Sequence, residues 1–95
     1  MALFDIDVRA RHTGANTAHV SVSAMASTPG YRLEFHKDPH FIYPPQWDLI
    51  AIPPAGIQRQ VISPVGGEFD IAVSENQKSI TVHYLSKSFA VSITD

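Results

Sequence analysis

The stretch that decides the fold runs from Gly67 to Thr94 and reads GEFDIAVSENQKSITVHYLSKSFAVSIT. It holds three runs in which apolar and polar residues alternate, centred on Ile71, Val82 and Val91. Successive residues of a β-strand point to opposite faces, so this alternation predicts strands with one apolar and one solvated face. We expect a three-stranded meander whose apolar face must be covered by the rest of the chain.

The remaining chain offers further short alternating runs that can provide this cover. Turn residues (Gly, Pro and Asn) separate strands expected at residues 2–10, 17–26, 31–36, 46–52 and 57–63. We expect Phe4, Ile6 and Val8 to share the apolar face of the first strand, and Pro64 to end the strand at 57–63. On the strand at 17–26 we expect Val20, Val22 and Ala24 to point inward and His19 to point outward. No window shows helical periodicity. About seven to eight short strands predict an all-β domain, either a single antiparallel β-sandwich or a small β-barrel.

Three features of the sequence carry a resemblance to a known architecture. They are Trp47 in a mid-chain strand, the turn at residues 53–56 (Pro-Pro-Ala-Gly), and the segment at 67–71 (Gly-Glu-Phe-Asp-Ile) that opens a late strand. On these residues the chain resembles the immunoglobulin-like sandwiches that serve as accessory domains in bacteria, such as those attached to some phospholipases. The cysteine pair and tyrosine corner of antibody domains are absent. The resemblance implies the sandwich fold and carries over no functional residue.

Composition limits the class of protein. A chain of 95 residues with 44% hydrophobic and 17% charged residues fits one globular domain covering residues 1–95. Its seven basic residues are scattered and are outnumbered by nine acidic ones, so nucleic acid is not an expected partner. The chain has no cysteine, which excludes disulfides, thiolate catalysis and cysteine-based zinc sites.

The N-terminal sequence MALFDIDVR has acidic residues where a signal peptide would be apolar. No apolar stretch is long enough to span a membrane, so we expect no membrane insertion. The default expectation is a cytoplasmic protein, and export by a route without a cleaved signal stays open.

Catalytic motifs are missing from the sequence. No serine lies in a Gly-x-Ser-x-Gly elbow, and no glycine-rich phosphate loop occurs. Two carboxylate pairs, Asp5 with Asp7 and Glu68 with Asp70, sit at strand spacing, which usually places them on a solvated outer face. We therefore expect no catalytic residue, no cofactor and no enzymatic activity.

A possible metal site lies in the middle of the chain. His36, Asp38 and His40 place two imidazoles and a carboxylate within five residues, a ligand set that zinc and similar metals accept. Pro39 prevents the helical geometry that zinc enzymes use, so these ligands would have to converge from a loop. Ordinary surface histidines are the favoured interpretation, and a metal-binding protein is an alternative.

The adjoining aromatic segment is a candidate ligand-binding loop. Phe41, Tyr43 and Trp47, beside His40 and Asp48, could pack on sugar rings and hydrogen-bond to their hydroxyls, or contact a protein. The favoured interpretation is that Trp47 and Phe41 instead close one end of the core. An exposed platform would indicate a small carbohydrate-binding module or lectin.

The outer face of the expected meander is a candidate interface. Ala72, His83, Leu85 and Ala90 lie on it among serines and threonines, with few charges. Such a flat face could contact a second copy or another protein. We therefore predict a non-enzymatic binding domain that self-associates or docks to a protein partner. The carbohydrate-binding module is the first alternative and the metal-binding protein the second.

Overall fold

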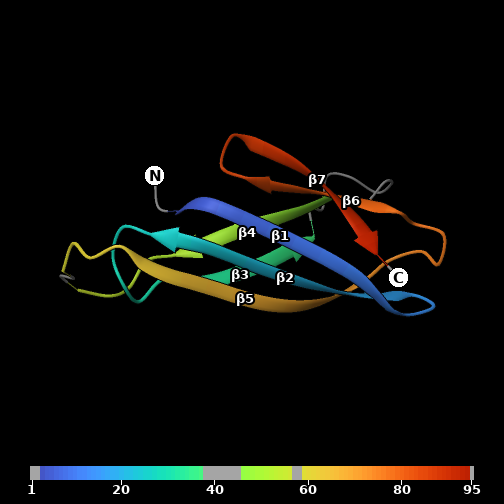
Figure 1. The fold of residues 1–95 in the computed structure, drawn as a ribbon, viewed down its shortest axis with the longest axis horizontal. Helices are drawn as coiled ribbons and strands as arrows, with labels where there is room; N and C mark the ends of the chain where they lie inside the picture. The colour runs from blue at the N-terminus through green and yellow to red at the C-terminus, as the bar shows by residue number, and fades with distance from the viewer. Residues whose placement is uncertain (1–2, 38–45, 57–58, 95) are drawn as a thin grey trace.

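The computed structural model describes residues 3–37, 46–56 and 59–94 (Figure 1). Within these ranges the chain forms seven strands and no helix, which confirms the all-β class. The strands are β1 (Leu3–Gly14), β2 (Thr17–Ala26), β3 (Arg32–Lys37), β4 (Gln46–Ile52), β5 (Ser63–Ala72), β6 (Ser79–Tyr84) and β7 (Lys87–Thr94).

The described strands form one hydrogen-bonded sheet in the order β3-β4-β6-β7-β1-β2-β5. Its two edge strands, β3 and β5, contact each other, so the sheet is nearly closed and barrel-like (Figure 1). Two neighbouring pairs, β1 with β7 and β4 with β6, are parallel. The expectation of a purely antiparallel sheet was therefore wrong, because a strand that crosses over before pairing again can return in the same direction.

The expected meander does not form. β6 and β7 are a hairpin, as predicted, but β5 pairs along its whole length with β2 at the far edge of the sheet. Alternation identified the apolar faces of β5, β6 and β7 correctly, and it carries no information on which strand is the neighbour. The three runs are therefore consecutive in the sequence but not in the sheet.

β5 also begins earlier than expected. It runs unbroken from Ser63 through Pro64 and the glycine pair, while residues 59–62 lie outside any strand. An edge strand tolerates proline because one row of its backbone groups has no partner strand. Neither Gly66 nor Gly67 has a positive φ. A Cβ on Gly67 would lie 2.8 Å from the ring of Phe69, so this glycine serves close packing rather than a turn.

The core lies between the inner faces of the strands. On β2 the predicted inward residues Val20, Val22 and Ala24 are all buried. Aromatic rings close the side where β3 and β5 meet: Phe35 stacks on Trp47 with centroids 5.5 Å apart and on Phe69 at 5.3 Å. The buried set consists of aliphatic side chains with two aromatic ones: Leu3, Ala10, Ala18, Val20, Val22, Ala24, Ala26, Leu33, Trp47, Leu49, Ile71, Val73, Ile80, Val82, Tyr84, Val91 and Ile93.

A β-bulge changes the expected face of β1 near its start. Phe4 pairs with Met25 and Asp7 with Ser23, so β1 takes three steps where β2 takes two. Asp5, inside the bulge, has a φ of 53°. The extra residue reverses the alternation. Leu3 is consequently buried, and Phe4, which we expected on the apolar face, is 38% exposed.

Candidate functional site

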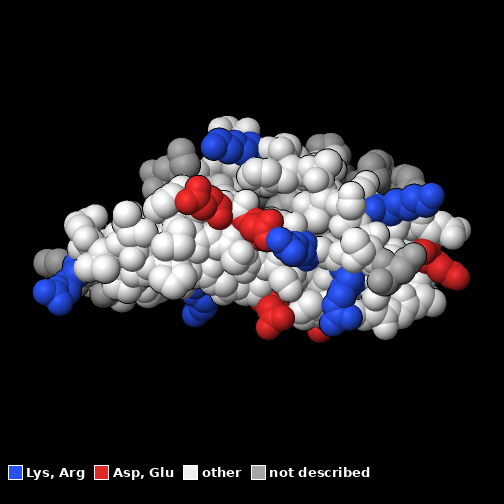
Figure 2. All heavy atoms as spheres, viewed as in Figure 1, with Lys and Arg blue, Asp and Glu red and all other residues white. Residues whose placement is uncertain are grey.

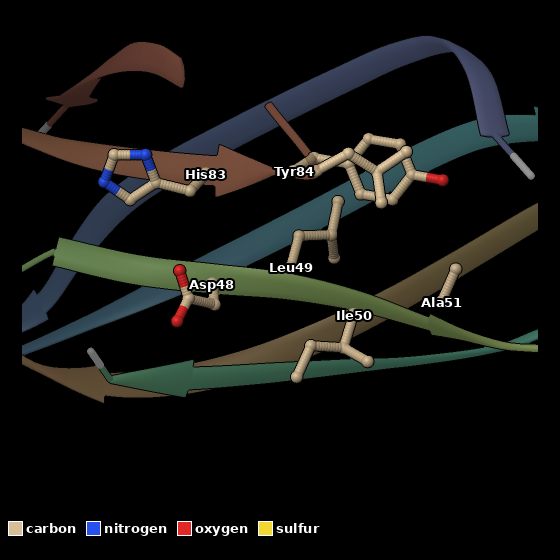
Figure 3. A pocket seen from close by; sticks show the side chains of 7 residues that line it. Asp48, Leu49, Ile50, Ala51, His83 and Tyr84 are labelled. Carbon is tan, nitrogen blue, oxygen red and sulfur yellow. The ribbon is translucent and has the colours of Figure 1, made fainter. Parts of the chain in front are cut away.

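A groove of about 560 Å³ lies between β4 and β6, beginning at the last pair of their parallel ladder (Figure 3). The pairing places Asp48 of β4 directly beside His83 of β6. The groove continues along both strands toward the turn that follows β6. Its lining residues are Asp48, Leu49, Ile50, Ala51, His83, Tyr84 and Leu85.

Hydrogen bonds hold the imidazole of His83 at one end of the groove. Its Nδ1 lies 2.8 Å from Oγ of Ser88, the facing residue on β7, and its Nε2 contacts Oε1 of Gln46 on β4. Because an amide oxygen only accepts, Nε2–H donates to Gln46, and in the neutral ring Nδ1 accepts from the Ser88 hydroxyl. The ring therefore bridges three strands and is fixed in orientation.

The carboxylate of Asp48 is the unusual group of this groove. Asp48 is half-buried, yet within the described part of the chain it makes no hydrogen bond or ion pair. Its oxygens are not among the buried polar atoms, so they remain open to solvent and to a ligand. The groove thus presents a carboxylate that a cation could pair with.

Apolar side chains lie beside this carboxylate. Ile50 is 41% exposed, and Leu85, in the turn between β6 and β7, is 71% exposed. Leu85 also has a φ of 56°, in the left-handed region that is uncommon for a residue with a bulky side chain. The two-residue hairpin loop of Leu85 and Ser86 requires this positive φ, so backbone strain and apolar exposure coincide at the rim of the groove.

The other candidates for the ligand-binding loop are placed only in part. Trp47 is 8% exposed and stacks on Phe35, as the core interpretation predicted. Its indole Nε1 is buried and has no hydrogen-bond partner among the residues described. Phe41, Tyr43 and His40 lie outside the described residues, so an aromatic platform formed by them stays a prediction.

The metal-site candidates are likewise placed in part. Nε2 of His36 lies 2.8 Å from Oε1 of Glu34 on β3, whereas Asp38 and His40 are outside the described residues. Across residues 3–37, 46–56 and 59–94, no three His, Asp or Glu side chains are grouped as metal ligands would be.

The four candidate interface residues do not share one face. His83 and Ala90 project from the adjacent strands β6 and β7, and Leu85 lies in the turn that joins them. Ala72 is the last residue of β5 and pairs with Thr17 of β2. In the sheet, β1 and β2 lie between β5 and β7. Sequence reasoning grouped them because it assumed that β5 neighbours β6.

A second polar cluster, which sequence reasoning did not assemble, lies on the outer face of β2 and β5. Nδ1 of His19 is 2.9 Å from Oδ1 of Asp70, and Nε2 is 3.0 Å from Oε1 of Glu68. The hydrogen bond to Asp70 and then that to Glu68 raise the pKa of His19 above its ordinary value of 6.5. Both ring nitrogens can donate only when the ring is protonated. The solvated faces of these residues were predicted, but the strand pairing was not.

Among the described residues no helix has the length and apolar character needed to cross a bilayer. No protein-family model, curated protein or solved structure matches the chain.

Proposed function

We propose that this chain is a non-enzymatic binding domain that docks a segment of another protein in the groove between β4 and β6. The observation that carries the proposal is the half-buried Asp48 carboxylate, unpaired within the described part of the chain. A Lys or Arg side chain from the partner would compensate this charge, and charge-assisted pairs of this kind are the stronger hydrogen bonds. Exposed Ile50 and Leu85, both further along the groove from Asp48, suit apolar side chains of the partner next to that cation.

The chemistry of the groove supports binding rather than hydrolysis. The Ser88 hydroxyl and the His83 ring are within hydrogen-bond distance, as in a nucleophile and its base. In such sites a third group orients the base, usually a carboxylate. Here the other ring nitrogen of His83 contacts the Gln46 amide, and Asp48 makes no hydrogen bond to the ring. This pattern is that of a structural hydrogen-bond network.

For the architecture that carries the groove we favour a small, incompletely closed barrel over the immunoglobulin-like sandwich. One continuous strand order and the contact between β3 and β5 support this choice. The stacked rings of Phe35 and Phe69 span the place where these edges meet. In a partly closed barrel the groove lies on the convex side, where an extended segment can reach it.

The test is a peptide titration followed by NMR. Displayed peptides with one Arg flanked by apolar residues would be selected against the protein, and the best binder titrated into wild type, Asp48→Asn, Leu85→Ala and the control Glu75→Gln. Glu75 is an exposed carboxylate outside this groove. We expect shifts at residues 48–51 and 83–85, and about tenfold weaker binding for Asp48→Asn, the effect of one lost charge-assisted hydrogen bond. Equal losses for Glu75→Gln, or none for Asp48→Asn, would refute the proposal.

A further inference from the structure

The outward side chains of β1, β2 and β5 form a second surface, distinct from the groove, which we name the β1–β2–β5 face. Figure 1 shows these strands side by side, and Figure 2 looks onto them, with charges of both signs on a mostly uncharged surface. The strand registers arrange the outward residues in rows across the three strands: Phe4–Met25–Pro64, Asp7–Ser23–Gly66, Arg9–Ser21–Glu68 and Arg11–His19–Asp70.

Two of the four rows carry opposite charges at their two ends, and a third carries only Asp7, on β1. In both rows β1 contributes an arginine, Arg9 or Arg11, and β5 contributes a carboxylate, Glu68 or Asp70. Within one molecule, the described residues form no ion pair between these arginines and these carboxylates, which are separated by β2. In these two rows the β1 end is therefore basic and the β5 end acidic.

We propose that a second copy of this chain packs on the β1–β2–β5 face about a two-fold axis parallel to β2. Such an axis keeps each row at its own level and exchanges its two ends. It places Arg9 of one copy over Glu68 of the other, and Arg11 over Asp70, so that four ion pairs form in the dimer. An isologous interface of this kind must be self-complementary, and these rows are.

The same operation also matches the uncharged row. It brings Phe4, which is 38% exposed, over the exposed Pro64 of the other copy, and it brings Met25 over its own counterpart. Ser21 and Ser23 lie on the central strand β2, Gly66 lies beside Ser23 on β5, and their small size lets the two sheets approach. One axis thus pairs apolar with apolar and opposite charges with each other.

The shape of the surface agrees with this arrangement. A hollow of about 270 Å³ lies between Arg9 and Arg11 on one side and His19 and Ser21 on the other. Glu68 and Asp70 have highly exposed side chains, and in the dimer they reach toward the hollow of the other copy. Nε–H of Arg9 donates a hydrogen bond to Oδ2 of Asp7 at 2.9 Å. The two terminal nitrogens of the Arg9 guanidinium are therefore available to the partner.

The size of the face sets the expected strength of the dimer. Three strands and the seven residues of β2 from His19 to Met25 span about 14 by 23 Å at ordinary strand spacing and rise, a small area for a specific interface. Ion pairs at the rim of an interface contribute specificity more than affinity. We expect a dimer of about micromolar affinity that weakens as the salt concentration rises.

Charge exchange tests the proposed axis. Arg11→Glu and Asp70→Arg each place like charges opposite each other twice, so each variant alone should dimerise at least about tenfold more weakly. An equimolar mixture of the two restores both ion pairs and should form a heterodimer close to wild-type affinity. Arg9→Glu with Glu68→Arg repeats the exchange one row away, and Arg59→Glu, which lies off the face, is the control. Sedimentation equilibrium measures each association, and circular dichroism verifies folding.

Cross-linking tests the same geometry without altering charge. The chain has no cysteine, so Ser23→Cys introduces one thiol that the two-fold axis places near its counterpart. A short bis-maleimide should link Ser23→Cys into a dimer and leave Ser92→Cys, exposed on β7, monomeric. A wild-type chain that stays monomeric into the submillimolar range overturns the proposal, as does a mixture that fails to recover dimerisation. If the mixture recovers dimerisation and the variants still bind peptide in the groove, the dimer interface is independent of the proposed binding function.

Discussion

The turn between β6 and β7 offers a sharp test of the link between strain and binding. Leu85 adopts a φ of 56° with its side chain 71% exposed. The left-handed region costs a non-glycine residue about 1–2 kcal/mol, and asparagine is several-fold enriched there because its side chain bonds locally. Leu85→Asn should therefore raise the free energy of unfolding by about 0.5–1 kcal/mol, the part of that cost which asparagine recovers. It should also weaken peptide binding in the groove.

Leu85→Ala is the matched control, because it removes the same apolar side chain and retains the backbone strain. We expect its stability to stay within about 0.5 kcal/mol of wild type, as is usual for an exposed site. Urea unfolding of the three proteins measures the difference, and thermal unfolding should show a rise of about 2–8 °C for Leu85→Asn alone. If the Asn variant is no more stable than the Ala variant, the turn is not strained. If both bind peptide as wild type does, Leu85 is not part of the site.

Three further predictions concern the core and the second polar cluster. Tyr84→Phe removes the buried hydroxyl oxygen that accepts the Leu3 N–H at 3.0 Å, and urea unfolding should show a loss of about 1–3 kcal/mol. Gly67→Ala places a methyl group 2.8 Å from the stacked ring of Phe69, so we expect a loss of about 1–3 kcal/mol and an altered near-ultraviolet circular dichroism spectrum. Because Asp70 and Glu68 raise the pKa of His19, its stabilising contribution is full below the unfolded-state pKa of 6.5 and disappears as pH rises through the folded-state value. His19→Gln should thus be less stable than wild type at mildly acidic pH and match it at alkaline pH. A difference in the free energy of unfolding that does not change with pH would contradict this prediction.

Alternation in the sequence was sufficient to predict the faces of most strands. Val20, Val22 and Ala24 were assigned to the core on this basis, and all three are buried. Phe4 was assigned incorrectly because a bulge at Asp5 shifts the alternation by one residue. Aspartate is one of the residues that tolerate positive φ, but its presence alone does not predict a bulge.

Neither polar site could be assembled from the sequence, because both depend on strand partners. Asp48 and His83 were each recognised as candidates, but in different sites, 35 positions apart in the chain. His19 and the Glu68–Asp70 pair were assigned to solvated faces without any indication that β2 and β5 are neighbours. Pairing is decided by the complementarity of whole strands and by the connections between them, and local patterns do not encode either.

One topological step produces both sites. Because β5 leaves the neighbourhood of β4 and pairs with β2, the position beside β4 is free for β6, and the resulting parallel pair brings Asp48 to His83. The same step carries Glu68 and Asp70 to His19, and gives the β1–β2–β5 face its acidic side. A sheet in which β5 paired with β6, as expected from the sequence, would have neither the groove nor the charged rows. The two surfaces, although they lie on different strands, therefore depend on the same crossing of the chain.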